Sequence, residues 1–332
     1  MASVRDEYPS VTVGVVGPGR MGLPIIYQLA QAGHDVRVYV RPGSRTRRIA
    51  PPITDPLARP ADGLEGAPAE ERVEEKDTAE LVREAGASVV ADLRDTVVGA
   101  SVVLICLFSQ PQVAEVLLGS EALMDRLEPG TTLVCHTSLG PRFAARLVEA
   151  ATARGVEVVD ALLDGTPHDL SDGRCNIILG ASDSAKDKVA PLLALYGDPI
   201  LHVGGPVSGH WVKLIQEYSL ATHYGVIENA AHFAKEVGLD PASTLEALSR
   251  GTAGSVMMTH ARSFDQANPA AFVDFCREFL AKDVLNYHED LSAHRLDAGL
   301  LGTFALAVAN DSVREHISAS ETSRPPGGIR SA

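Results

Sequence analysis

The sequence of 332 residues has only four cysteines, few aromatic residues and no long apolar run. The cysteines are scattered without a CxxC pair, which argues against a disulfide framework and a structural zinc site. No apolar run approaches the ~18 residues that a membrane-spanning helix needs. The first residues also lack the apolar core of a secretion signal, so we expect a cytoplasmic protein.

Basic residues are scarce, with 29 Lys and Arg against 43 Asp and Glu and a net charge of −14 at pH 7. Phosphate backbones and anionic lipid surfaces repel so acidic a chain, so we expect no nucleic acid or membrane partner. The 11 histidines show neither HxxxH nor HExxH spacing, and no G-x-S-x-G or P-loop pattern is present. We therefore predict no metal site and a small-molecule substrate as the partner.

Short β-branched runs alternate with helical patterns over the first part of the chain. We expect strands at 11–16, 35–40, 88–91, 101–107, 131–135, 156–160, 175–179 and 199–203, with helices that include 20–32, 141–153 and 184–195. This alternation is typical of parallel βαβ units whose sheet is covered by helices on both faces. It predicts an α/β domain over residues 1–203, with a doubly wound parallel sheet of the Rossmann type.

The pattern changes after residue 203, where apolar residues recur at helical spacing. Helices are predicted at 211–237, 241–248, 270–295 and 300–310, which makes residues 204–320 an all-helical C-terminal domain. We interpret residues 321–332 as a disordered tail. The segment at about 42–85 interrupts the first domain with proline pairs and acidic residues, and we interpret it as a mobile insertion.

A GxGxxG pattern follows the first expected strand and opens a helix. Gly17 permits a tight turn, Gly19 lets backbone amides approach a pyrophosphate, and Gly22 allows close packing of helix on strand. The N-terminus of the helix adds partial positive charge for the phosphates. We predict that this loop, which also contains Arg20 and Met21, binds a dinucleotide.

Arginines gather after the second expected strand, where an NAD site usually carries an acidic residue for the ribose hydroxyls. Arg41 takes that place and is followed by Ser44 and Arg45, with two more arginines at 47 and 48. Asp35 lies at the opposite end of the strand. A basic cluster in an acidic chain suits the 2′-phosphate of NADP, so we predict NADP(H) rather than NAD(H). The alternative is a solvated basic loop.

Several short motifs occur in the order typical of a known enzyme family. Besides the glycine loop, they are ICLFS at 105–109 with VAEVLLG at 113–119, HTS at 136–138, DALLDGT at 160–166, GPVSGHWVK at 205–213 and Lys-Asp at 282–283. From residue 11 to about 308, the chain resembles the β-hydroxyacid dehydrogenase family, which includes the 3-hydroxyisobutyrate dehydrogenases and is related to 6-phosphogluconate dehydrogenase. The resemblance implies an oxidoreductase that acts on a CH–OH group and forms a homodimer or homotetramer through the helical domain.

The resemblance also implies roles for individual residues. The cofactor contacts fall on Leu107, Phe108, Ser109, Val113, Thr137 and Lys282. The substrate contacts fall on Asp164, Gly165 and Thr166 in one loop and on Glu217, four residues after the catalytic position. We add His210 to the substrate contacts on charge grounds, because it stands one turn before Lys213 and can help offset the acidic residues there, as can His168. We expect the active site between the two domains, at the carboxyl ends of the strands.

Lys213 is the residue that the resemblance identifies as catalytic. Hydride reduction of a carbonyl needs a proton donor at the oxygen that also stabilises the developing negative charge, and a lysine at the start of a helix meets both needs. We predict that Lys213 protonates the carbonyl oxygen and accepts the alcohol proton in the reverse direction. The alternative is a surface ion pair with Glu217, in the less favourable order for such a pair.

Two acidic residues depart from the family pattern. Glu217 replaces the usual asparagine, and Asp164 begins a loop that is usually Ser-Gly-Gly. One explanation is a cationic or neutral substrate, such as an amino-bearing aldehyde, a ketone, an imine or a specialised metabolite. The other is that Asp164 and Glu217 pair with Arg174, Lys213 or each other, which leaves the substrate class unchanged.

Two other functions stay open beside a dehydrogenase. One is an imine reductase-like enzyme, although relatives of that type usually place Asp or Tyr where this chain has Lys213. The other is a dinucleotide-binding regulatory protein without turnover, which the departures at Asp164 and Glu217 keep in view.

Overall fold

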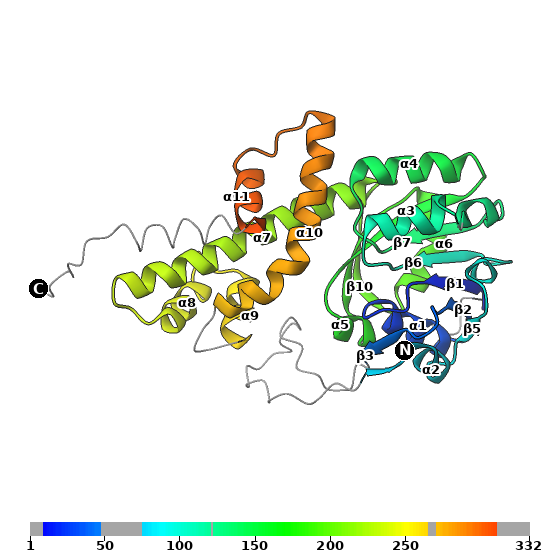
Figure 1. The fold of residues 1–332 in the computed structure, drawn as a ribbon, viewed down its shortest axis with the longest axis horizontal. Helices are drawn as coiled ribbons and strands as arrows, with labels where there is room; N and C mark the ends of the chain where they lie inside the picture. The colour runs from blue at the N-terminus through cyan, green and yellow to red at the C-terminus, as the bar shows by residue number, and fades with distance from the viewer. Residues whose placement is uncertain (1–8, 48–74, 121, 265–269, 311–332) are drawn as a thin grey trace, which may run out of the picture. The chain divides into compact units, whose positions relative to one another are not determined.

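The computed structural model describes residues 9–47, 75–120, 122–264 and 270–310 (Figure 1). Its contacts divide the chain into two compact units, Met1–Lys213 and Leu214–Ala332. The division falls inside helix α7 (Ser208–Glu236), beyond the boundary expected at residue 203. The predicted tail at 321–332 lies outside the described residues.

An eight-stranded sheet organises the N-terminal unit, in the order β10-β9-β8-β7-β6-β1-β2-β5. The strands are β1 (Thr12–Val16), β2 (Asp35–Tyr39), β5 (Ser88–Val90), β6 (Val102–Ile105), β7 (Thr132–Cys135), β8 (Glu157–Asp164), β9 (Cys175–Gly180) and β10 (Gly197–Gly204). Neighbouring strands are parallel except β8 and β9. The predicted Rossmann-type α/β fold is confirmed, with β9 and β10 running against the other strands.

The reversal at β9 follows from the length of the connection. Only the short helix α5 (Pro167–Ser171) separates β8 from β9. A parallel crossover needs a dozen or more residues. The chain therefore turns back and pairs β9 with β8 in antiparallel register, which sets Asp160 opposite Gly180 and Asp164 opposite Asn176.

Apolar clusters cover both faces of the sheet. One contains side chains of α1 (Gly22–Gln31), α2 (Thr78–Glu84), α5 and α6 (Asp183–Leu193), and the other contains side chains of α3 (Gln110–Leu118) and α4 (Pro141–Thr152). Strand β6 shows the alternation that this requires, because Val102 and Leu104 belong to the first cluster and Val103 and Ile105 to the second. Figure 1 shows α3 and α4 on one side of the sheet and α1 and α5 on the other.

The segment predicted as a mobile insertion is ordered at both ends. Strands β3 (Arg45–Arg47) and β4 (Glu75–Asp77) pair in antiparallel register, and α2 follows β4 directly. Asp77 caps α2 by accepting a hydrogen bond from the backbone N–H of Glu80. The expectation for 42–85 is therefore corrected at its ends, while residues 48–74 lie outside the described part.

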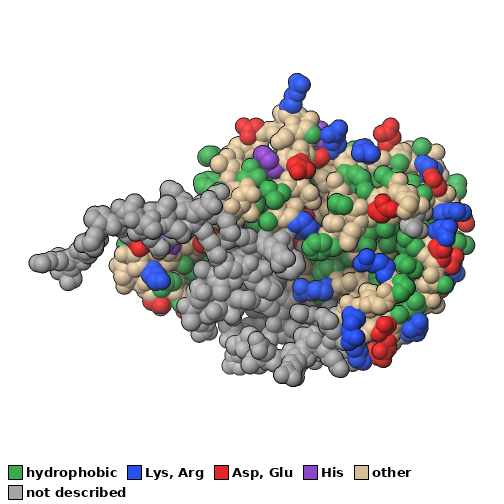
Figure 2. All heavy atoms as spheres, in the orientation of Figure 1, with side chains coloured by type: hydrophobic (Ala, Val, Ile, Leu, Met, Phe, Trp, Pro, Cys, Tyr) green, Lys and Arg blue, Asp and Glu red, His purple; other side chains and the backbone are tan. Residues whose placement is uncertain are grey.

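In its described residues the second unit consists of helices joined by short turns and loops, without strands, as predicted. It contains the rest of α7, α8 (Pro241–Ser249), α9 (Val256–Phe264), α10 (Ala270–His294) and α11 (Gly299–Ala309). None of the helices in the described ranges is long and apolar enough to cross a membrane. On the visible face of the N-terminal unit, acidic and basic side chains are interspersed (Figure 2).

Candidate functional site

The glycine loop turns tightly between β1 and α1. Gly17 has φ +106°, and a Cβ there would lie 2.2 Å from the carbonyl oxygen of Cys106. A Cβ on Gly22 would lie 2.0 Å from the carbonyl oxygen of Gly17, so both positions need glycine. Gly19 differs, because no atom lies within 4 Å of the place of its Cβ. The loop is thus packed closely on one side and open at Gly19.

The start of α1 leaves its first amides without a side-chain cap. Met21 occupies the N-cap position and makes no side-chain capping bond. Arg20, beside it, is exposed. Among the first amides of the helix, the N–H of Leu23 donates to the carbonyl oxygen of Gly19 at 2.9 Å, and Pro24 has no N–H. An anion at this helix N-terminus therefore meets the amide of Gly22 and those of the loop before it. The structure therefore brings the five predicted loop residues together in a geometry that suits a pyrophosphate.

Three hydroxyl groups cluster beside the glycine loop. The Oγ1 atom of Thr46 lies 2.9 Å from Oγ1 of Thr78, which donates to Oγ of Ser44 at 3.2 Å. Thr46 also donates to the carbonyl oxygen of Pro18 at 3.4 Å. Sequence reasoning identified Ser44 but missed the two threonines, because Thr78 joins the cluster only through the β3–β4 ladder.

Arg41 and Arg45 are exposed near this cluster in the chain. Arg41 follows the end of β2, and Arg45 begins β3. Asp35 stands at the start of β2, where its carboxylate accepts hydrogen bonds from Arg37 at 2.8 and 3.1 Å. The carboxyl end of β2 therefore carries arginine, and the acid at the other end is already paired.

The next predicted contacts lie after β6. The backbone N–H of Leu107 donates to Oγ1 of Thr137 at 2.9 Å, and the Thr137 hydroxyl donates to the carbonyl oxygen of Leu107 at 3.0 Å. These bonds join the ends of β6 and β7. Phe108 is 61% exposed, and Ser109 stands at the N-cap position of α3. Val113 is fully buried in the apolar cluster under α3.

Lys213 lies on α7 and reaches the end of β8. Its side chain is 7% exposed, and Nζ donates a hydrogen bond to the carbonyl oxygen of Leu163 at 3.2 Å. The next residue, Asp164, accepts a hydrogen bond from Nδ2 of Asn176 at 3.0 Å across the antiparallel pair. Gly165 follows and is exposed. The structure thus places the predicted catalytic lysine and the first substrate-loop residues at one edge of the sheet.

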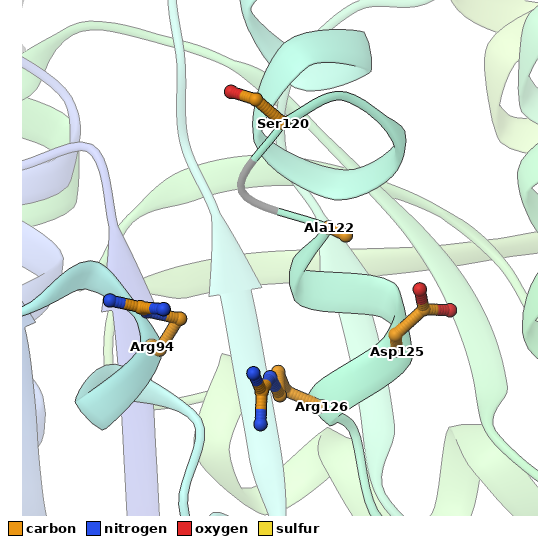
Figure 3. Close-up of a pocket in the computed structure, with 5 residues that line it drawn as sticks. All are labelled: Arg94, Ser120, Ala122, Asp125 and Arg126. Carbon is orange, nitrogen blue, oxygen red and sulfur yellow. The ribbon is translucent and has the colours of Figure 1, made fainter.

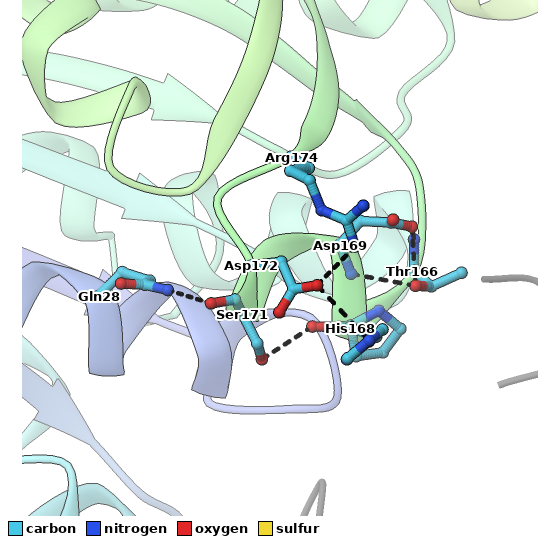
Figure 4. A network of polar contacts seen from close by, with 8 residues as sticks. Gln28, Thr166, His168, Asp169, Ser171, Asp172 and Arg174 are labelled. Atoms are coloured by element: carbon cyan, nitrogen blue, oxygen red, sulfur yellow. Dashed lines mark hydrogen bonds and ion pairs between the residues drawn. The ribbon is translucent and has the colours of Figure 1, made fainter. Parts of the chain in front are cut away.

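Thr166 acts as the N-cap of α5 (Figure 4). Its hydroxyl donates to Oδ2 of Asp169 at 2.8 Å and accepts from the backbone N–H of Asp169 at 3.2 Å. Thr166 is 3% exposed, so its hydroxyl is committed to this capping box. The sequence carries the signal, because threonine is followed by proline and then, three residues on, by aspartate.

Arg174 takes a different partner from the one considered in the sequence. It forms an ion pair with Asp172 at 2.5 Å, and His168 lies 3.5 Å from the same carboxylate (Figure 4). Asp164 is instead bonded to the neutral amide of Asn176. The pairing of Asp164 with Arg174, which was one of the alternatives left open by the sequence, is therefore not formed.

A buried carboxylate that sequence reasoning did not select lies under the start of α7. Asp160, on β8, is fully buried, and burial raises its pKa to about 7. His210 is 1% exposed, with Nε2 at 3.4 Å from Oδ1 of Asp160. Burial lowers the pKa of His210 to about 3. His210 was predicted to contact substrate, and the structure places it inside this junction.

Two predicted residues belong to the helical unit. Glu217 is 7% exposed on α7. Lys282, on α10, forms an ion pair with Asp283 at 3.2 Å. In the described ranges, no group of three or more His, Cys, Asp or Glu side chains is arranged to hold a metal ion.

A cavity of about 380 Å³ lies elsewhere in the N-terminal unit (Figure 3). It is lined by Arg94, Ser120, Ala122, Asp125 and Arg126. Arg94 is paired with Asp92, and Asp125 is paired with Arg154. None of the predicted site residues lines this cavity, so we do not assign it to the candidate site.

Comparison with known proteins covers nearly the whole described chain. Residues 12–73 and 69–205 match the family model described as the NAD binding domain of 6-phosphogluconate dehydrogenase. Residues 207–319 match the model described as NAD-binding of NADP-dependent 3-hydroxyisobutyrate dehydrogenase. The chain is also 28% identical to 2-hydroxy-3-oxopropionate reductase of Escherichia coli over 243 residues, which are 73% of this chain and 72% of that protein.

Solved structures share the fold. The 3-hydroxyisobutyrate dehydrogenase of Mycobacterium tuberculosis with L-serine has a TM-score of 0.71 at 19% identity, over 96% of this chain and 100% of that chain. An imine reductase from Myxococcus stipitatus in complex with NADP+ has a TM-score of 0.53 at 17% identity, over 94% of this chain and 95% of that chain. At these identities the likeness concerns the fold alone.

Proposed function

Because the chain belongs to the β-hydroxyacid dehydrogenase family, we propose that it transfers hydride between NADP(H) and the CH–OH or C=O carbon of a small substrate. The family consists of pyridine-nucleotide-dependent oxidoreductases, and the proposal adds the phosphorylated cofactor and the reacting group. The observation that carries it is the buried Lys213, held at the end of β8 by the carbonyl of Leu163.

The described residues fit a dinucleotide at the glycine loop. Gly17 and Gly22 allow β1, β6 and α1 to approach closely, while the open space at Gly19 allows a phosphate to reach the backbone. The amide of Gly22 and those of the loop before it bind the phosphates. When bound, the nicotinamide supplies or accepts the hydride.

Hydride transfer must be accompanied by proton transfer, and a side chain of the protein carries out this second step. The ammonium group of Lys213 has three N–H donors, and its bond to Leu163 fixes the direction of one of them. In reduction, Nζ donates a proton to the carbonyl oxygen while negative charge develops there. In oxidation, the neutral amine of Lys213 accepts the hydroxyl proton and becomes the ammonium group. Burial strengthens the attraction between the ammonium group and the developing negative charge, because that charge is poorly screened at a side chain with 7% exposure.

Preference for NADP(H) is supported by the groups after β2. Arg41 and Arg45 supply positive charge, and the Ser44 hydroxyl, which accepts a hydrogen bond from the buried Thr78, has its own hydrogen to donate at the same edge of the glycine loop. Together they suit a phosphate dianion better than a ribose hydroxyl.

Asp164 supports a substrate that carries an amino group. Its hydrogen-bond partner, Asn176, is neutral and does not cancel the carboxylate charge, and the nearby Arg174 is paired with Asp172. A carboxylate at the substrate loop attracts an ammonium group and repels a carboxylate. We propose an aldehyde or ketone bearing a protonated amine, with Asp164 holding the amine and Lys213 facing the oxygen.

We also propose that the protein is a homodimer or homotetramer through its helical unit. Large apolar side chains are exposed on that unit, among them Phe233, Leu300 and Phe304. Burying them against a second copy removes apolar surface from water. Light scattering on the purified protein, at several concentrations, tests this assembly.

One experiment separates the proposed function from its alternatives. Binding of NADPH is followed by fluorescence, and turnover is then measured on matched aldehydes, ketones and imines, each with and without an amino group. Turnover of amino-bearing carbonyls supports the proposal. Turnover of imines alone indicates an imine reductase-like enzyme, and tight binding without any turnover indicates a regulatory protein.

A further inference from the structure

Three elements meet at a buried carboxylate beneath the first turn of α7. Asp160 lies in the middle of β8, opposite Gly180 of β9, and its Oδ2 atom accepts a hydrogen bond from the backbone N–H of Gly209 at 3.1 Å. A Cβ on Gly180 would lie 2.5 Å from Oδ2, and a Cβ on Gly209 would lie 2.7 Å from Cβ of Asp160. Glycine at both positions is what lets the helix reach the carboxylate.

The turn before α7 is strained and bonded to the same carboxylate. Val207 has φ +78°, a left-handed conformation that a β-branched residue rarely adopts. The N–H of Gly209 donates to this carboxylate, and the nearby amides of Val207 and His210 also favour its charged form and oppose the effect of burial on its pKa. The carboxylate therefore offsets the strain by satisfying amides at the start of the helix.

His210 completes the junction from the helix side. Its Nδ1 atom accepts a hydrogen bond from the backbone N–H of Leu139 at 3.3 Å. In a neutral imidazole, Nε2 then carries the hydrogen, and it faces Oδ1 of Asp160 at 3.4 Å. This Oδ1 accepts no conventional hydrogen bond from the described residues, so the ring is the polar group placed to face it.

Helix α7 is thus attached to β8 at two levels. The lower attachment joins His210 and Gly209 to Asp160, and the upper one joins Lys213 to the carbonyl of Leu163. The two helix residues with side-chain attachments are three apart in sequence, and so are their partners on the strand. A shift of the first turn therefore moves the lysine as well, because the helix between them is rigid over one turn.

We propose that Asp160 and His210 are positioning residues, which set the place of the Lys213 ammonium group by fixing the first turn of α7 on strand β8. This inference rests on the proposed function, in which Lys213 transfers the proton. It assigns Asp160 and His210 no contact with substrate or cofactor.

The test compares Asp160→Asn with Glu157→Gln in the full-length protein. Both variants replace a carboxylate of β8 by its amide, but Glu157 is the first residue of the strand and lies near Ser182 and Lys188. In Asp160→Asn one carboxylate oxygen becomes an NH2 group. This NH2 group then faces an N–H donor of the junction instead of accepting a hydrogen bond from it, which weakens the attachment of the helix. We expect kcat to fall about 100-fold, as for a small misplacement of a catalytic group, with KM and the Kd of NADPH changed less than twofold.

Variants at His210 give a second readout. Glutamine offers one acceptor and one donor, as the neutral ring does, whereas leucine offers neither. We expect His210→Gln to retain most of kcat and His210→Leu to lose it, with His202→Gln on β10 as the histidine control. This rescue keeps the proposal testable if Asp160→Asn fails to fold.

A double variant separates this inference from the proposed function. If Lys213→Met keeps normal turnover, the proposed function fails, whatever Asp160 does. If Lys213→Met lowers turnover about 100-fold to a rate that is still measurable, Asp160→Asn in that background should cause no further loss. The inference is overturned if Asp160→Asn matches Glu157→Gln, if the losses at Asp160 and Lys213 are additive, or if kcat falls only in step with cofactor binding and folded fraction.

Discussion

The Nζ atom of Lys213 donates a hydrogen bond to the carbonyl oxygen of Leu163, 3.2 Å away. The bond ties α7 to the carboxyl end of β8, the edge of the sheet where α/β proteins bind ligands. Asp164 follows Leu163 directly, so the proposed proton donor and the proposed substrate contact share this edge. The chemistry assigned to the protein depends on this arrangement.

Two substitutions in the glycine loop are expected to affect cofactor binding and stability separately. Gly19→Ala places its Cβ in open space, so we expect an unchanged Tm but at least a tenfold rise in the Kd of NADPH, because the methyl group keeps phosphate from the backbone. Gly17→Ala meets the Cys106 carbonyl in a left-handed conformation, and we expect a clear loss of stability. Thermal unfolding and NADPH titration check both, and equal Tm losses for the two variants would contradict the assignment.

Cofactor preference depends on the arginines after β2. Replacing Arg41 and Arg45 by alanine removes charge-assisted bonds to the 2′-phosphate, so we expect the Kd of NADPH to rise about tenfold or more and that of NADH to stay nearly constant. Arg37→Ala is the control, because its partner is Asp35 at the start of β2. Titrations with both cofactors decide the matter. A parallel weakening of NADH and NADPH would show that the arginines do not discriminate.

The preference for a positively charged substrate depends on Asp164. In Asp164→Asn the shape is kept and the negative charge is lost, so we expect kcat/KM for an amino-bearing carbonyl to fall about 10- to 100-fold. The matched uncharged carbonyl should react as before. Asp172→Asn is the control, since that carboxylate is paired with Arg174. Equal effects on the two substrates would remove Asp164 from substrate recognition.

Buried histidines make stability depend on pH. Burial lowers the pKa of His34, of His136 to about 4 and of His210 to about 3. Between pH 6.5 and 4 the unfolded chain binds protons that these rings do not, so the free energy of unfolding falls on acidification through that window. Asp160 acts oppositely, because its pKa is raised to about 7 and its contribution falls as pH rises from about 4 to 7.

The three histidines with lowered pKa outnumber the one carboxyl with raised pKa. We therefore expect the free energy of unfolding to fall on going from pH 7 to pH 5, by roughly 1.4 kcal/mol per pH unit for each proton that the unfolded chain binds in excess. His136→Gln should make this slope shallower, because it removes one ring whose Nδ1 and Nε2 contact Ala161 and Tyr196. Urea unfolding at the two pH values measures the slope, with His202→Gln as control. An unchanged slope for His136→Gln would contradict the assignment.

Most of the sheet was predictable because its signals are local. The β-branched run at Thr12–Val16 ends at Gly17, whose positive φ requires the residue that the sequence shows there. The reversed direction of β9 was not predicted, because it depends on the shortness of the α5 connection. The role of Thr166 as a helix cap was also not predicted. Its capping pattern is local, but these residues were interpreted as part of a substrate loop.

The junction at Asp160 could not be found from local pattern. Asp160 lies in an apolar strand, its partner Gly209 is 49 positions further along, and Gly180 is brought opposite it only by the antiparallel turn. His210 looked like a substrate contact because it stands one turn before Lys213. Its partners, Asp160 and the N–H of Leu139, come from elements that meet only in the folded sheet.

The central claim, proton transfer by Lys213, is tested most directly by the single-turnover rate of hydride transfer in Lys213→Met. Methionine keeps the length of the side chain and removes the proton donor, and Lys188→Met on α6, whose lysine pairs with Glu157, is the control. We predict a rate lower by about 100-fold or more with an unchanged Kd for NADPH. A Lys213→Met rate close to that of the Lys188→Met control would contradict the account.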